Sequence, residues 1–144
     1  MARLLRRVGG TLVLDAEGLV KLAANHAATY ARVKAARDRH GNVVTAASTL
    51  TEVLRGGPKD ARVHRVLRRM TVIPIDKQQG REAGELLGRA GLPGHRCGLD
   101  ALLAVVALAQ PRPVVLLTSD PTDLARLTEE PGRPKAQRIQ VVRV

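Results

Sequence analysis

Five acidic residues of this basic chain stand where an α/β fold would bring them together. They are Asp15, Glu52, Asp100, Asp120 and Asp123. Asp15 and Asp120 each follow an apolar run that is typical of a buried parallel strand, and the ligand crevice of an open α/β sheet lies beyond the carboxyl ends of its strands. Carboxylates held close together repel one another, so they must take up protons or share a cation. The pattern therefore predicts a site for a hard divalent metal, Mg²⁺ or Mn²⁺.

Helix capping is the competing interpretation for the acids that follow strands. Asp15 is placed to cap the next helix, a common role for Asp. Asp120 precedes Pro121 and Asp123, and this order is typical of a helix start. Capping alone explains each acid taken singly. A shared metal site is favoured because an Asp follows each of the two strands that are expected at the centre of the sheet.

The remaining two acids also suit ordinary structural roles. Glu52 lies in a short amphipathic segment, where a lone Glu is usually solvated. Asp100 is expected in the first turn of an apolar helix, where the helix dipole favours an acid. A helix that is apolar on all sides is buried, however, so we expect Asp100 to point into a cleft.

The elements that must position these acids are predicted by hydrophobic periodicity. Apolar, β-branched runs alternate with segments of helical period, which predicts an α/β fold with a parallel sheet covered on both faces. Strands are expected near 11–15, 42–45, 71–75, 114–118 and 139–143. Helices are expected near 17–24, 26–40, 46–55, 59–70, 77–90, 98–110 and 121–128. The last strand alternates apolar with polar residues, which suits an edge, whereas the unbroken runs suit the centre of the sheet.

Composition sets further limits. The 144 residues suit one domain, 1–144, with a basic N-terminal arm at 1–10. Tyr30 is the only aromatic residue, so the core is expected to be aliphatic. Cys97 has no partner for an internal disulfide, and no apolar run is long enough to cross a membrane. We therefore expect a cytoplasmic protein with no membrane association.

The charge balance favours a polyanionic partner. Lys and Arg number 24 against 13 Asp and Glu, a net charge of +11. Such a surplus attracts nucleic acid, although a basic surface can also serve only solubility. Basic residues gather in two predicted helices: Arg32, Lys34, Arg37 and Arg39 in one, and Arg62, Arg65, Arg68 and Arg69 in the other. Runs of this kind are more often solvated faces than specific contacts.

The order of the acidic segments resembles the four acidic motifs of PIN domains, especially those of VapC-type toxins. The matching segments cover nearly the whole chain and read Leu12-Val13-Leu14-Asp15, Thr51-Glu52-Val53-Leu54-Arg55-Gly56, Leu99-Asp100-Ala101-Leu102-Leu103-Ala104 and Leu117-Thr118-Ser119-Asp120-Pro121-Thr122-Asp123-Leu124. One departure is Ala16-Glu17-Gly18, because family members often carry Ser or Thr directly after the first acid.

The resemblance implies a three-layer α/β/α sandwich with a parallel five-stranded sheet of order 3-2-1-4-5. It also implies a Mg²⁺- or Mn²⁺-dependent endoribonuclease that cleaves single-stranded or loop RNA, held inactive by a cognate antitoxin and commonly a homodimer.

Within this hypothesis the acids take different roles. Asp15, Asp100 and Asp120 bind the metal, while Glu52 and Asp123 orient bound water or a second, substrate-dependent ion. The predicted catalytic set is therefore Asp15, Glu52, Asp100 and Asp120, and the predicted metal set is Asp15, Asp100, Asp120 and Asp123.

Two further functions remain open at this point. The chain could be a PIN-like module that binds RNA or a protein without cutting. It could also be a metal-dependent phosphatase, because Asp15-Ala16-Glu17 faintly resembles the nucleophilic Asp-x-Asp turn at a strand end. Glu in place of the second Asp counts against the phosphatase. A zinc site at His95 and Cys97 is disfavoured because the chain holds no other Cys and its remaining His residues are scattered.

Overall fold

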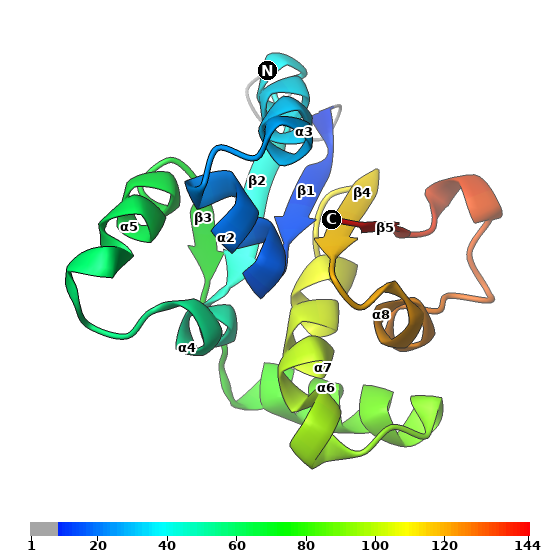
Figure 1. Cartoon of the computed structure of the whole chain (residues 1–144). Coiled ribbons are helices and arrows are strands. Elements are labelled where there is room, and N and C mark those ends of the chain that lie inside the picture. Colours follow the sequence, from blue (N-terminus) through cyan, green and yellow to red (C-terminus); the bar gives the residue numbers. More distant parts are fainter. Residues whose placement is uncertain (1–8) are drawn as a thin grey trace.

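A parallel sheet of five strands forms the centre of the computed structural model, which describes residues 9–144. The strands are β1 (Thr11–Leu14), β2 (Asn42–Ala46), β3 (Thr71–Ile73), β4 (Val114–Thr118) and β5 (Gln140–Arg143). Their order is β3-β2-β1-β4-β5, and all four neighbouring pairs are parallel (Figure 1). The predicted sheet order is confirmed, with the unbroken apolar runs inside the sheet and the alternating β5 at an edge.

Helices connect the strands, and the longer ones follow the predicted segments closely. They are α2 (Ala16–Ala23), α3 (Ala27–Asp38), α4 (Leu50–Val53), α5 (Ala61–Leu67), α6 (Lys77–Ala90), α7 (Gly94–Leu108) and α8 (Pro121–Leu127). Single 3-10 turns occur at η1 (Ala47–Thr49), η2 (Pro58–Asp60) and η3 (Lys135–Gln137).

Two layers of helices cover the sheet, so the predicted three-layer α/β/α sandwich is confirmed. On one face Val13, Val44 and Leu116 point into a core made with α6, α7 and α8. On the other face Leu12 and Leu14 pack against α2 and α3, with side chains of α4 and α5 at the margin. Adjacent residues of β1 therefore serve opposite cores, as the two-residue period of a strand requires. Both cores are aliphatic, and Tyr30 lies on the surface with 52% of its area exposed.

Three predicted helices differ from those observed. The segment 46–55 divides into η1 and the short α4, and 59–70 begins as the turn η2 before α5. The predicted helix 98–110 begins earlier, at Gly94, directly after Pro93. The additional first turn contains Cys97, which is 1% exposed and packs in the core.

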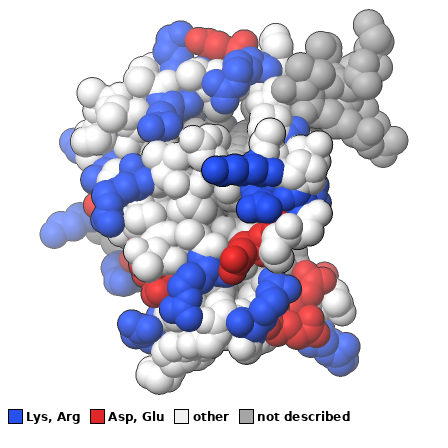
Figure 2. Space-filling model, turned by 90° about the vertical axis from the view of Figure 1, so that its right-hand side faces the viewer, with Lys and Arg blue, Asp and Glu red and all other residues white. Residues whose placement is uncertain are grey.

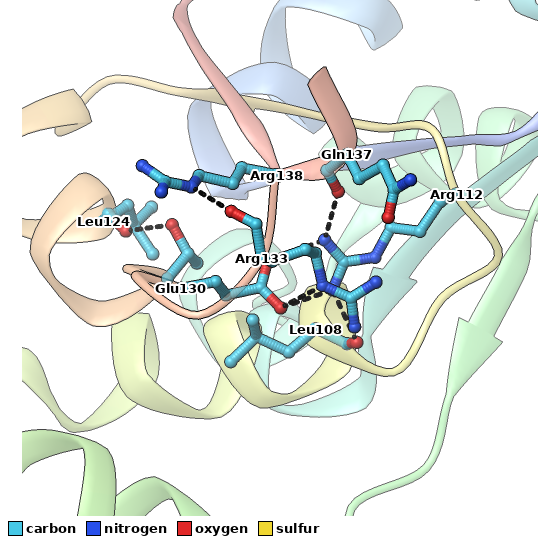
Figure 3. Close-up of polar contacts among 8 residues, drawn as sticks. Leu108, Arg112, Leu124, Glu130, Arg133, Gln137 and Arg138 are labelled. Atoms are coloured by element: carbon cyan, nitrogen blue, oxygen red, sulfur yellow. Dashed lines mark hydrogen bonds and ion pairs between the residues drawn. The ribbon is translucent and has the colours of Figure 1, made fainter. Parts of the chain in front are cut away.

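The segment after α8 is fastened to the start of β4 by an ion pair. Arg112 donates from both terminal nitrogens to Glu130, at 2.7 and 3.0 Å, and Arg133 donates to the same carboxylate at 3.1 Å (Figure 3). Burial opposes ionisation of Glu130, but hydrogen bonds and positive charge from Arg112 and Arg133 outweigh it and lower the pKa of the carboxyl. Two-pronged Arg–carboxylate pairs fix geometry. This one positions the connection that leads to the edge strand β5.

The predicted basic arm at 1–10 lies outside the described residues except for its last two. Gly9 and Gly10 are buried, so they belong to the folded body and not to an arm. A Cβ atom on Gly9 would lie 2.5 Å from the backbone nitrogen of Gly41, which explains why the chain needs glycine at this crossing. Within residues 9–144 no helix is both long and apolar enough to span a bilayer.

Candidate metal centre

The exits of β1 and β4 meet at one edge of the sheet. The two strands are neighbours, with Leu14 opposite Leu117, and the backbone N–H of Asp15 donates to the Leu117 carbonyl at 3.1 Å. Both strand arrows point toward α7 in Figure 1. Asp15 directly follows β1 and Asp120 follows β4 after one residue, so both acids leave the sheet at this edge.

Asp15 is held by hydrogen bonds from two directions. Its Oδ1 accepts from the backbone N–H of Gly18 at 2.8 Å and so caps α2. Its Oδ2 accepts from the backbone N–H of Ser119 at 2.8 Å and from the Ser119 hydroxyl at 3.4 Å. The side chain is only 7% exposed. The capping interpretation is therefore correct for Asp15, and the same carboxylate also ties together the exits of two strands.

Asp120 and Asp123 lie at the start of α8. Asp120 caps the helix and accepts from the Asp123 backbone N–H, but at 3.4 Å this bond is long. Thr118 accepts from the Asp120 backbone N–H at 2.9 Å and sets the direction in which the chain leaves β4. The Asp123 carboxylate accepts from the Cys97 thiol at 3.6 Å, which joins α8 to α7. Both acids are half-buried.

Asp100 reaches the same place from α7. Because this helix begins at Gly94, Asp100 lies in its second turn and not in its first, so the expected dipole interpretation is wrong. Cys97 and Ala101 face the core, and Asp100, between them on the helix, is half-buried. A half-buried acid beyond the first turn is not explained by capping.

Three carboxylates converge at this edge. Oxygens of Asp100, Asp120 and Asp123 all lie within 4.8 Å of one another, and no other such group of three metal-binding side chains occurs among residues 9–144. Burial raises the pKa of Asp100 to about 6, and the charges of Asp120, Glu52, Asp15 and Asp123 add to the shift. The other four predicted acids are therefore all near enough to act on the ionisation of Asp100.

Glu52 lies at the margin of the group. It comes from α4, and it lines the same cleft as Asp100 although much of its surface is accessible to water. Desolvation raises the pKa of its carboxyl, and the charge of Asp15 raises it further. Neither Glu52 nor Asp15 belongs to the three-carboxylate group. Their roles as metal ligand or catalytic residue therefore stay predictions, as do those of the other acids.

A cleft of about 560 Å³ lies between α6 and the first half of α7, next to the acids. It is open because small residues line it: a Cβ on Gly80, Gly84 or Gly98 would meet nothing within 4 Å. Glu52 and Asp100 also line the cleft, as do the exposed side chains of His95 and Arg96. The cleft thus combines negative and positive side chains, an arrangement suited to a metal-bound phosphate ligand.

The fold has a counterpart among solved structures. No protein-family model and no curated protein sequence matches the chain. A chain in the crystal structure of VapBC2 from Rickettsia felis bound to a DNA fragment from their promoter matches with a TM-score of 0.64, over 92% of this chain and 98% of that chain. This chain has a PIN-like fold. The resemblance to PIN domains is confirmed at the level of the fold, and at 16% identity the match establishes the fold alone.

The donor set of this PIN-like site suits a hard divalent cation. Asp100, Asp120 and Asp123 offer only oxygen, which is the preference of Mg²⁺ and Mn²⁺. The ion pairs among residues 9–144 use Asp38 and Glu130, so none of the three acids has a basic partner there. Within the described residues no ion pair offsets their mutual repulsion, and a cation would relieve it.

Sequence reasoning missed two residues that shape the PIN-like site. Ser119 supplies a backbone donor that holds Asp15, and no local pattern marks it because a backbone N–H group carries no sequence signal. Cys97 contacts Asp123. Its position three residues before Asp100 places both on neighbouring helix positions, a spacing that could have identified it.

Proposed function

We propose that this protein is a metal-dependent endoribonuclease that cleaves single-stranded or loop RNA, and that it is the toxin of a toxin–antitoxin pair. The observation that carries the proposal is the convergence of Asp100, Asp120 and Asp123 at the carboxyl edge of a PIN-like sheet. Asp100 also lines the cleft of about 560 Å³, through which we propose that RNA approaches the acids.

The acids have different roles in this proposal. Asp100, Asp120 and Asp123 hold Mg²⁺ or Mn²⁺, and Asp15 keeps the two strand exits together while adding negative charge. When bound, the ion supplies a Lewis acid that activates water and offsets charge on the scissile phosphate. Glu52, which lines the cleft, orients water or a second ion in this proposal.

The surface charge supports a polyanionic substrate. Net charge is +11, and Figure 2 shows Lys and Arg side chains at many places on the face in view, while Asp and Glu gather in a few groups. A positive field concentrates RNA near the protein. Close to the acidic centre, however, the carboxylates repel phosphate, so a cation is needed between them.

Cleavage of a mixed RNA pool tests the proposal. The wild-type protein should cut with Mg²⁺ or Mn²⁺ and not in EDTA, and Asp120→Asn and Asp100→Asn should abolish cutting. Asp38→Asn is the matched control, because it makes the same change at an exposed acid that pairs with Lys34 on α3. Undiminished cutting by both site variants would contradict the proposal.

A cognate antitoxin is the partner that this function requires. The matching chain comes from a VapBC2 assembly, which supports such a partner here. Expression in the cytoplasm should arrest growth, and a small protein encoded beside the gene should relieve the arrest. We further propose a homodimer, which sedimentation of the purified protein would test. Growth that continues normally would count against the toxin role.

The alternative is a PIN-like module that binds RNA or protein without cutting. The half-buried Asp100 favours the enzyme, because a raised pKa near several acids is typical of a functional site. RNA binding without any metal-dependent cleavage would favour the module instead.

A further inference from the structure

A second pocket lies at the opposite edge of the sheet, where β2 and β3 begin. It has a volume of about 320 Å³, and its charged lining consists of Arg37, Arg68 and Arg69. We call it the arginine pocket. Asn42 and Thr71, the first residues of β2 and β3, also line it. At about 3.3 Å per residue, the length of β2 separates this edge from the carboxyl edge by roughly 15 Å. The pocket is thus distinct from the acidic centre.

The three arginines come together without an acidic partner. Arg37, from α3, donates to the backbone carbonyl of Arg69 at 2.9 Å, which fixes its guanidinium beside the segment that follows α5. No carboxylate lines the pocket, and none of the ion pairs among residues 9–144 uses these arginines. The neighbouring Asp38 pairs with Lys34 instead, at 2.9 Å. Positive charge in the arginine pocket is therefore uncompensated within the described part of the chain.

Arg37 is the partly buried member of the arginine pocket, whereas Arg68 and Arg69 are exposed. Burial lowers the pKa of Arg37, and the charge of Arg69 lowers it further. The Asn42 amide and the Thr71 hydroxyl make no side-chain hydrogen bond within residues 9–144, so they remain available beside the guanidinium groups. Guanidinium groups present paired N–H donors that match phosphate oxygens. The donors and the charge together select a phosphate group.

We propose that the arginine pocket binds a phosphate group, carried either by a nucleic-acid strand or by a small molecule. The site does not depend on the proposed nuclease activity, because it needs neither the acids nor a metal. If the carrier is a strand, RNA bound at the acidic centre gains a second point of attachment on the far edge of the sheet.

Two double variants with the same change of charge test the nucleic-acid source. Arg68→Gln with Arg69→Gln alters the pocket, and Arg62→Gln with Arg65→Gln alters exposed arginines of α5 outside it. Binding of a fluorescein-labelled single-stranded RNA is followed by anisotropy in EDTA, where no cleavage interferes. The pocket variant should bind roughly tenfold more weakly than the control variant. A plot of the logarithm of its binding constant against the logarithm of the salt concentration should be less steep, by about 0.7 in slope for each lost phosphate contact.

Inorganic phosphate tests the small-molecule source. In nuclear magnetic resonance spectra of the wild type at constant ionic strength, phosphate should shift the backbone amides of Asn42, Arg69 and Thr71 saturably, whereas chloride should not. The pocket variant should lose these shifts and keep the rest of its spectrum. A response to RNA alone assigns the site to a strand, and a response to phosphate alone assigns it to a small ligand. Equal RNA binding by the two double variants, together with no saturable phosphate shift in the wild type, would overturn the proposal.

Discussion

The backbone N–H of Ser119 donates a 2.8 Å hydrogen bond to Oδ2 of Asp15 across 104 residues of sequence. The other oxygen of Asp15 caps α2 through Gly18. One carboxylate thus fastens the exit of β4 to the exit of β1 and starts the helix that follows. Among residues 9–144 no ion pair includes Asp100, although it lies in the same acidic neighbourhood. Changes at these two acids should therefore alter stability in opposite directions.

Replacing Asp15 by Ala should destabilise the metal-free protein. The change leaves two backbone donors, at Gly18 and Ser119, without their acceptor, and a buried donor that loses its partner costs about 1–3 kcal/mol. Urea unfolding in EDTA measures the free energy of unfolding. Asp38→Ala is the control and should change it little, because Asp38 belongs to an exposed pair with Lys34. Equal stability of Asp15→Ala and wild type would show that capping and bridging contribute nothing.

Replacing Asp100 by Asn should stabilise the metal-free protein at neutral pH. The pKa of this carboxyl is raised to about 6 in the folded protein, which means that the fold opposes ionisation of Asp100. Asn has nearly the same shape as Asp but carries no charge. One pKa unit corresponds to about 1.36 kcal/mol, and solvent screening reduces the effect. The free energy of unfolding should therefore rise by about 1–2 kcal/mol in Asp100→Asn. Urea unfolding in EDTA at pH 7 measures it, and a loss of stability would contradict the prediction.

The pH dependence of this difference has a defined sign. The pKa of Asp100 in the folded protein lies above the unfolded value of 3.8. Asp100 therefore does not destabilise the fold below about pH 4, and its destabilising effect grows as the pH rises toward about 6. The stability of wild type relative to Asp100→Asn should fall across that window and level off above it. Comparing the two proteins at each pH cancels the titrating groups that do not interact with Asp100. A difference that stays constant from pH 4 to 7 would refute the assignment.

Apolar patterning was sufficient to predict the sheet. The run at 114–118 is β4 with the same bounds, and the run at 11–15 is β1 apart from Asp15, because short unbroken apolar runs are typical of parallel strands buried on both faces. The edge strand β5 followed from its alternation. The strand order came from the resemblance of the four acidic motifs to PIN domains, and the structure confirms it.

The interior of the candidate site could not be predicted in the same way. The sequence offered capping and metal binding as rival roles for Asp15, whereas the structure shows that it caps α2 and also lies among the acids. The sequence also predicted that the helix carrying Asp100 begins near residue 98, whereas α7 begins at Gly94 and buries Cys97 in its first turn. Contacts between distant segments set both outcomes.

Cys97 should act as a positioning residue for Asp123. Its thiol donates to the carboxylate at 3.6 Å, so Cys97→Ala removes the donor while Cys97→Ser keeps one. By analogy with partners of metal ligands elsewhere, loss of the donor should weaken Mn²⁺ binding roughly tenfold or more. Calorimetric titration with Mn²⁺ measures the affinity. The Ser variant should bind more tightly than the Ala variant, and identical affinities would exclude a positioning role.

Filling the cleft should block RNA without affecting the metal. Gly84 lines the cleft and Gly88 lies one turn further along α6 outside it, and a Cβ at either position meets nothing within 4 Å. Leu at either site should stabilise the helix by up to about 1 kcal/mol. Only Gly84→Leu should reduce RNA cleavage, with Mn²⁺ affinity unchanged. Equal cleavage by the two variants would show that substrate does not use this cleft.

Mn²⁺ binding measured by electron paramagnetic resonance tests most directly whether the converging carboxylates form one metal site. Metal-free wild type and the control Asp38→Asn should each bind Mn²⁺ at the acidic centre, with loss of the free-ion signal. Asp120→Asn should lose most of that affinity while keeping its fold, because one of three converging ligands is gone. Binding by Asp120→Asn and Asp100→Asn that is as tight as in the wild type would contradict a metal site at Asp100, Asp120 and Asp123.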